Sequence, residues 1–455
     1  MLAAPVLAQQ PRPEQPGDQP PPRDSQPDNR PPRREPGRGG RQGGQGERGG
    51  QRTDQPRRGE GGGQGNQYTL EQACSDRAQL HTIAFNGLAF MTGDFASLTF
   101  IPPGKVSDFF GFQYMRDIDA AHTGHNPKFL DRVAGNVLKI MTEKQRSAFE
   151  VAAREQAPLA DEIARKRLPL IKAFHRELLG DRPAGSTGLS LAAVKAFGAD
   201  LFALGAKLAY QRAKAFGTLT TGLSAEQKAA LAKMKFGDFT TWPEIDQQAF
   251  RRLRPAGQGK GVSVMYMTLA SEFFSWHAGS IEADTYFCPE RHGTYFGGFY
   301  LKDLPAMGQK DYNISTSLTG DSGAAFLEAL NAEQRGTITA IIDQQRAALK
   351  EIVDVRREIS TKLRGFQKGE GPAEDEIVRL GRRYGELDAE LAWDYATAFA
   401  KVYRTLTDEQ KTALHKLRSM ESKEQGNVFI YAERTPMPEL QNTDFLFEVP
   451  SEGKR

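Results

Sequence analysis

Cysteine is scarce in this sequence of 455 residues, where only Cys74 and Cys288 occur. A small domain stapled by several disulfides is therefore excluded. In an oxidising compartment the two thiols could pair and close a long loop, which would stabilise the folded chain. Nothing in the sequence shows that they are close in space, so this pairing stays open.

The sequence also lacks a strong charge of one sign and any long apolar run. It has 60 basic and 57 acidic residues, which gives a net charge of +3. Such a balance provides no field that would draw nucleic acid or an anionic membrane. No run of 18 apolar residues is present, so we expect no membrane-spanning helix.

Familiar catalytic patterns are missing as well. The sequence has no G-x-S-x-G elbow, P-loop, H-E-x-x-H helix, paired-carboxylate constellation or C-x-x-C-H haem attachment. We therefore predict no catalytic residue and no cofactor, apart from the metal ion considered below. The sequence does not decide whether the chain is an enzyme, and these absences weigh against one.

Residues 9–67 are nearly devoid of Val, Ile, Leu and aromatic side chains. They consist mainly of Pro, Gly, Gln and Arg, which cannot bury enough apolar area to offset the entropy of ordering. We predict a disordered linker. Its stretch RGGRQGGQGERGGQR resembles an RGG box, but Arg alternates there with acidic residues and no aromatic is present, so a soluble spacer is favoured over an RNA-binding segment.

The first eight residues form a short apolar run that ends in Val6-Leu7-Ala8, followed by Gln9. Small side chains at the first and third of these positions suit signal peptidase. We therefore predict that residues 1–8 are the remnant of a signal peptide and that the protein is periplasmic or secreted.

The rest of the chain contains two halves that resemble each other. Residues 99–117 align without a gap on residues 285–303, and LAYQRAKAFGTLTTGLSAEQK, which begins at Leu208, aligns with LAWDYATAFAKVYRTLTDEQK, which begins at Leu391. Ordered matches over so much of each half indicate an internal repeat. We predict helical repeat 1 at residues 68–255, helical repeat 2 at 256–445 and a C-terminal tail at 446–455.

Each predicted repeat follows one helical plan. An apolar helix (about 72–91 and 262–277) precedes a Gly/aromatic segment, two long amphipathic helices and a shorter one. In the second repeat, apolar residues recur every three, four or seven positions from about 332 to 366. We predict an all-α fold in which a tandem duplication forms a pseudo-two-fold antiparallel bundle. Pro158 and Pro169 should kink the equivalent helix of the first repeat.

Four predicted helices begin with the same short motif, in which a Leu or Met precedes a small polar residue and a Gln follows three positions later. This spacing suits a capping box, because the small side chain accepts from a backbone N–H and the Gln reaches back. The capping pairs are Thr142 with Gln145, Ser224 with Gln227, Asn331 with Gln334, and Thr407 with Gln410.

Through these four motifs the chain resembles the Spy/CpxP superfamily of periplasmic proteins, whose hallmark is a pair of L-T-x-x-Q motifs on a small helical subunit. The resemblance covers only the helical parts, and Ser224 and Asn331 stand where the family has Thr. It implies a curved helical cradle that holds unfolded clients or senses envelope stress and metals. Two motifs per half would make this chain a fused pseudo-dimer of such subunits.

An aromatic block lies in each Gly/aromatic segment. The two blocks align with each other and could line a groove for apolar client segments, although side chains of this kind are more often core. The candidate client-binding residues are Phe109, Phe110, Phe112, Tyr114, Tyr295, Phe296, Phe299 and Tyr300.

Two loops carry metal-type side chains. His122 and His125 lie three positions apart, and Cys288 and His292 lie four apart. Such ligands would favour zinc or copper, but neither cluster supplies three of them, and ordinary loop residues are the simpler interpretation.

These observations favour an extracytoplasmic helical binding protein, chaperone-like or related to envelope stress, that holds apolar segments of unfolded or envelope proteins without covalent chemistry. One alternative is a metal-binding or redox envelope protein that uses Cys288 and His292. Another is a structural or assembly protein of the envelope. Both a monomer with an internal pseudo-dimer and a homo-oligomer fit the repeat.

Overall fold

The computed structural model describes residues 76–92, 127–234, 241–253, 260–278, 322–418, 440 and 442–448. All of them belong to a single compact unit. The described residues are almost entirely helical, so the predicted all-α class is confirmed.

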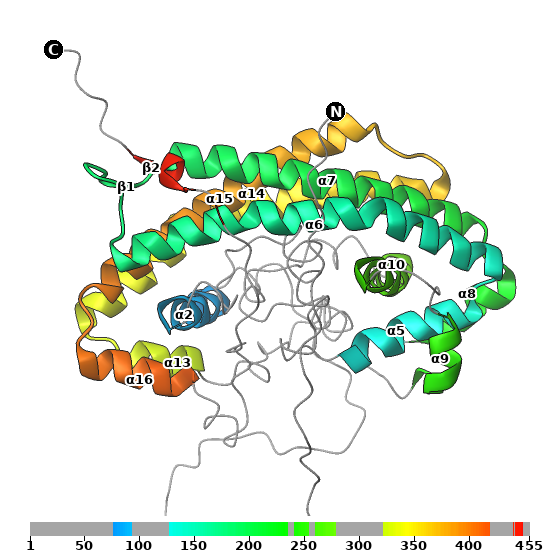
Figure 1. The fold of residues 1–455 in the computed structure, drawn as a ribbon, viewed down its shortest axis with the longest axis horizontal. Helices are drawn as coiled ribbons and strands as arrows, with labels where there is room; N and C mark the ends of the chain where they lie inside the picture. The colour runs from blue at the N-terminus through cyan, green and yellow to red at the C-terminus, as the bar shows by residue number, and fades with distance from the viewer. Residues whose placement is uncertain are drawn as a thin grey trace, which may run out of the picture. The chain divides into compact units, whose positions relative to one another are not determined.

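The elements fall in the same order in the two halves of the chain: a first helix, a short helix, two long helices and another short one (Figure 1). The first half contains α2 (Asp76–Thr92), α5 (Pro127–Ile140), α6 (Glu143–Leu179), α7 (Leu191–Thr221), α8 (Ala225–Lys233) and α9 (Gln247–Leu253). The second half contains α10 (Lys260–Ala278), α13 (Ser322–Glu328), α14 (Ala332–Arg364), η6 (Gly365–Lys368), α15 (Glu374–Tyr403) and α16 (Asp408–Arg418). Origin of the two halves by duplication stays a prediction.

Helix α6 continues through both of its prolines, Pro158 and Pro169, without ending at either. It begins after the Thr142 N-cap and ends at Gly180, whose φ of 74° lies in the left-handed region that favours glycine. The first helices extend close to the predicted ranges, and α14 with η6 covers the long helix predicted at 332–366.

The four long helices α6, α7, α14 and α15 pack along one another, with α7 against α15 as the main contact between the halves (Figure 1). Glycines allow this approach. A Cβ on Gly198 would lie closer than 3.0 Å to Gly385 and Ala389, and one on Gly381 would lie closer than 3.0 Å to an atom of Ala206. Backbones therefore meet where α7 crosses α15.

These contacts are reciprocal between the halves. In the alignment that places Leu208 on Leu391, Gly198 falls on Gly381 and Ala206 falls on Ala389. Gly198 meets Ala389, and Gly381 meets Ala206. In a two-fold interface, when residue i of one copy contacts residue j of the other, residue j of the first copy also contacts residue i of the second. The contacts between α7 and α15 follow this pattern.

Two large clusters of buried side chains form most of the described interior, and a smaller one lies among α7, α14 and α15. The first core lies among α5, α8, α10, the N-terminal half of α6 and the C-terminal half of α7. The second core lies among α2, α13, α16, the N-terminal half of α14 and the C-terminal half of α15. The long helices contribute residues to both cores.

The first helix of each half packs in the core built mainly by the other half (Figure 1). Helix α2 contacts α13, α14, α15 and α16, whereas α10 contacts α5, α6, α7 and α8. We call this the exchanged arrangement of α2 and α10. It interlocks the two halves, because each half completes its core with a helix from the other.

A small two-stranded sheet lies at one edge of this body. Strand β1 (Gly188–Leu189) pairs antiparallel with β2 (Phe447–Glu448), which follows η8 (Asp444–Leu446). Leu446 and Phe447, which begin the segment predicted as a C-terminal tail, are buried. No helix in the described part of the chain is long and apolar enough to cross a membrane.

Candidate functional site

All four motifs predicted from the sequence form capping boxes. The N-caps Thr142, Ser224, Asn331 and Thr407 each accept from the backbone N–H of the glutamine three residues later. The glutamine oxygen accepts in return from the backbone N–H of the N-cap, at 2.9 to 3.0 Å. Each box satisfies two N–H groups at a helix start, and an N-cap of this kind stabilises by about 1 kcal/mol.

The two glutamines of the first half also bind each other. Gln227 Nε2 donates to Gln145 Oε1 at 2.7 Å, and Gln145 Nε2 lies 3.3 Å from Gln227 Oε1. Gln227 donates further to the carbonyl of Ile140 at 2.8 Å, and Gln145 donates to that of Gly222 at 3.2 Å. We call this pair the first glutamine clasp; each amide joins its own helix start to the chain just before the other.

The second half repeats the arrangement at matching positions. Gln410 Nε2 donates to Gln334 Oε1 at 2.8 Å and to the carbonyl of Ala329 at 2.9 Å. Gln334 Nε2 lies 3.3 Å from Gln410 Oε1 and donates to the carbonyl of Thr405 at 3.0 Å. This pair is the second glutamine clasp.

The clasps explain why glutamine rather than glutamate stands at these positions. A carboxylate accepts hydrogen bonds but donates none. With glutamate at position 334, a charged oxygen would face the carbonyl of Thr405, and Gln334 is only 3% exposed. The motif therefore holds the starts of two helices together, in addition to capping each of them.

A buried polar cluster connects α10 to the first core. Arg212 on α7 forms an ion pair with Glu272 on α10, and both side chains are less than a tenth exposed. The guanidinium also donates to Gln156 on α6 at 2.9 Å and contacts the sulfur of Met265 at 3.2 Å. Three helices thus meet at one arginine.

A neutral cluster connects α2 to the second core in the same way. The Tyr395 hydroxyl on α15 donates to Gln345 on α14 at 2.7 Å, and Gln345 donates to Gln79 on α2 at 2.7 Å. The buried amide of Asn86, also on α2, has no hydrogen-bond partner among the described residues.

The alignment of the halves superposes the two clusters position by position. The alignment that matches Leu208 with Leu391 places Arg212 on Tyr395. The alignment that matches Thr142 with Asn331 places Gln156 on Gln345. The gapless match of residues 99–117 with 285–303, extended back into the first helices, places Gln79 on Met265 and Asn86 on Glu272. One cluster is charged and its counterpart is neutral.

The charged cluster is electrostatically costly. Burial raises the pKa of Glu272 to about 7, and the neighbouring Arg212 opposes this shift by less. Burial also lowers the pKa of Arg212, and Glu272 opposes that change. One carboxylate oxygen of Glu272 has no partner among the described residues. Taking two charges out of water is favourable only if they stay paired.

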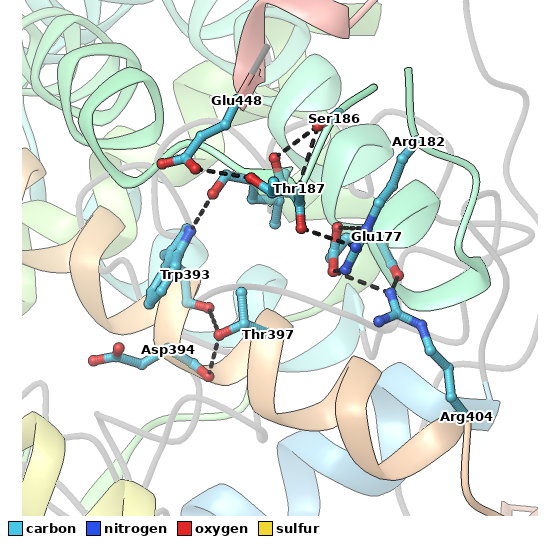
Figure 2. A network of polar contacts seen from close by, with 11 residues as sticks. Glu177, Arg182, Ser186, Thr187, Trp393, Asp394, Thr397, Arg404 and Glu448 are labelled. Atoms are coloured by element: carbon cyan, nitrogen blue, oxygen red, sulfur yellow. Dashed lines mark hydrogen bonds and ion pairs between the residues drawn. The ribbon is translucent and has the colours of Figure 1, made fainter. Parts of the chain in front are cut away.

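A third polar network holds the C-terminal end of α6 to α15 (Figure 2). Glu177, whose side chain is 3% exposed, forms ion pairs with Arg182 and Arg404. Nearby, the Trp393 indole N–H donates to the carbonyl of Leu189 in β1 at 2.9 Å. Glu177 is held by two guanidinium groups, so its role in this network is to join elements.

The C-terminal segment adds further contacts to the same corner. The Thr187 hydroxyl donates to Glu448 at 3.0 Å (Figure 2). Arg176 forms ion pairs with Asp181 and Asp444 and lies over the ring of Phe447. No sequence motif marked this corner, because the bonds from Trp393 to Leu189 and from Thr187 to Glu448 join residues more than 200 positions apart.

Most predicted site residues lie outside the described part of the chain. The candidate client-binding residues there are Phe109, Phe110, Phe112, Tyr114, Tyr295, Phe296, Phe299 and Tyr300, and the candidate metal ligands are His122, His125, Cys288 and His292. Among the residues that the structure describes, no three His, Cys, Asp or Glu side chains come together as a metal site. Client binding and metal binding both stay predictions.

Comparison with known proteins bears on the second half. Residues 325–418, from α13 to α16, match the family described as LTXXQ motif family protein. This is the family of Spy/CpxP-type periplasmic proteins, so the resemblance is confirmed for that part of the chain, which contains the second glutamine clasp. No curated protein and no solved structure matches the chain.

Proposed function

We propose that this protein is an extracytoplasmic helical binding protein, chaperone-like or related to envelope stress, that holds apolar segments of other proteins without covalent chemistry. The observation that carries the proposal is the match of residues 325–418 to the LTXXQ family, whose members are typically periplasmic. Both motifs of the matched part are present and joined in the second glutamine clasp.

The aromatic blocks are the proposed client-binding residues. The first block lies in the sequence between α2, which packs in the second core, and α5, which packs in the first core. The second block lies between α10 in the first core and α13 in the second. The helices that flank each block in the sequence therefore pack in different cores, and this shared feature supports a shared role for the pair. Neighbouring Lys and Arg side chains would speed the encounter with clients.

The experiment compares aggregation of a chemically denatured client protein with and without the full chain, in the absence of ATP. We expect suppression at an equimolar ratio, measured by light scattering. Replacing Phe109, Phe110, Phe112 and Tyr114 by Ser should weaken suppression at least several-fold, because apolar contact drives client binding.

The matched control removes exposed apolar side chains elsewhere. Val151 and Leu179 on α6 are 53% and 57% exposed, and replacing both by Ser should leave suppression unchanged. Full chain that fails to suppress aggregation at equimolar ratio contradicts the proposed function. Equal losses in the aromatic variant and the control contradict the assignment of the client-binding residues.

A further inference from the structure

The exchanged arrangement of α2 and α10 needs a cause, because the chain offers an alternative. The two first helices are similar in length, occupy equivalent places in the two halves and bury matching apolar residues such as Ile83 and Leu269. Each could in principle complete the core of its own half, with α2 in the first core and α10 in the second. Apolar burial alone distinguishes the two arrangements poorly.

The polar clusters do distinguish them. In the exchanged arrangement, Glu272 of α10 meets Arg212, and Gln79 of α2 is hydrogen-bonded to Gln345, which accepts from the Tyr395 hydroxyl. In the alternative arrangement, Asn86 would stand opposite Arg212, and Glu272 would stand opposite Tyr395. The cation of Arg212 and the carboxylate of Glu272 would then be buried apart from each other, and breaking a buried ion pair is strongly destabilising.

We propose that the buried ion pair between Arg212 and Glu272 determines which core each first helix occupies, and so enforces the interlocked form of the protein. A single polar or charged contact in an otherwise apolar interface is known to select one pairing over another at some cost in stability. The neutral counterpart cluster tolerates α2 and rejects α10. This inference does not depend on the proposed function.

The test moves the arginine without moving the glutamate. In the double variant Arg212→Tyr with Tyr395→Arg, the cation lies in the second core, so charge pairing should draw α10 there and place α2 in the first core. The quadruple variant adds Asn86→Glu and Glu272→Asn. It moves the whole ion pair to the second core, restores charge matching for the exchanged arrangement, and should return both helices to their original places.

Distances between spin labels in the full chain report the arrangement, with Cys74 and Cys288 replaced by Ser in every sample. Labels at Ala278 on α10 and Ala229 on α8 report α10 in the first core, since these helices are in contact. Labels at Ala278 and Thr412 on α16 report α10 in the second core. All three positions are exposed.

In the protein without the charge substitutions, we expect the distance from Ala278 to Ala229 to be shorter than that from Ala278 to Thr412. The double variant should reverse this order, and the quadruple variant should restore it. If the double variant fails to fold, recovery of the original distances in the quadruple variant still supports the proposal. A folded double variant with the original distances overturns it, as does a quadruple variant that does not recover them. Size-exclusion chromatography with light scattering identifies dimers, in which α10 docks on a second copy. A dimeric double variant whose α10 lies in the first core of that copy also contradicts the proposal.

Discussion

The amide of each motif glutamine has two hydrogen-bonding tasks, and only one of them is visible in the sequence. The spacing Thr-x-x-Gln or Ser-x-x-Gln predicts a capping box because both partners lie within one helical turn, and the structure has boxes at Thr142, Ser224, Asn331 and Thr407. The clasps join residues 82 and 76 positions apart. Short-range patterns carry no information on such pairs.

The second glutamine clasp leads to a stability prediction. Replacing Gln334 by Glu keeps the shape of the side chain but removes the donor to Thr405 and Gln410. Because a buried carbonyl then faces a carboxylate, we expect the free energy of unfolding to fall by about 1–3 kcal/mol. Urea denaturation at pH 7 measures the change.

The control makes the same replacement on the same helix. Gln344 of α14 is exposed, and Gln344→Glu should change the free energy of unfolding by less than about 0.5 kcal/mol. Equal effects at positions 334 and 344 would show that the clasp contributes nothing beyond the charge of the new side chain.

Asp394 leads to a prediction of pH dependence. Burial raises the pKa of this carboxyl to about 6, Glu390 adds to the shift and Lys195 opposes it. Between about pH 4 and pH 6 the Asp394 carboxyl of the folded chain therefore keeps its proton. In the unfolded chain, where this carboxyl has its usual pKa of 3.8, the proton has already been lost. This contribution to stability is present at low pH and is lost as the pH rises from about 4 to 6.

The variant Asp394→Asn cannot lose that proton. Its Tm relative to the parent protein should increase as the pH is raised from about 4 to 6 and stay level above that range. Thermal unfolding followed by circular dichroism between pH 3.5 and 7.5 measures the difference. A difference that does not vary with pH would mean that the carboxyl titrates alike in the folded and unfolded chain.

At the scale of whole elements, the close approach of α7 to α15 depends on glycines, which have no side chain at the crossing. A Cβ on Gly385 would overlap the carbonyl oxygen of Gly198, which is backbone and cannot move aside. Gly385→Ala should therefore force the two helices apart and lower the free energy of unfolding by about 1–3 kcal/mol. Chemical denaturation measures the loss.

Gly336 on α14 provides the matched control, because a Cβ there would meet nothing within 4 Å. Gly336→Ala should raise the free energy of unfolding by about 0.5–1 kcal/mol. Alanine has fewer backbone conformations than glycine in the unfolded chain, so it loses less entropy when the helix forms. Stabilisation by both substitutions would show that the crossing has room for a methyl group.

The sequence contained a signal for this crossing that the helical pattern concealed. Gly381 and Gly385 are four positions apart, on one face of a helix, where glycine otherwise weakens helix formation. The corner around β1 and β2 offered no such signal. Leu446 and Phe447 form too short an apolar run to predict burial, and their partners come from α6 and β1 far upstream.

For the molecule as a whole, the sequence predicted the number and order of the long helices, because amphipathic periodicity is a local property. The predicted boundary near residue 255 separates two stretches of sequence, but the described helices do not pack as two separate bodies. Helix α10 lies in the first core and α2 in the second. Both alternatives bury the same apolar residues, so periodicity cannot select between them.

This interlocking predicts that damage to one half appears in the other. Ile83 on α2 and Leu269 on α10 are equivalent in the alignment and fully buried. Replacing either by Ala removes about 2–5 kcal/mol of packing. We expect Ile83→Ala to increase amide hydrogen exchange in α13, the start of α14 and α16, because these helices surround α2. Leu269→Ala should instead increase exchange in α5 and the start of α6, which surround α10.

Hydrogen exchange is measured by mass spectrometry on peptides from both halves, and each variant serves as the control for the other. Faster exchange in the half that carries the substitution, with the opposite half unchanged, would mean that each first helix packs on its own repeat.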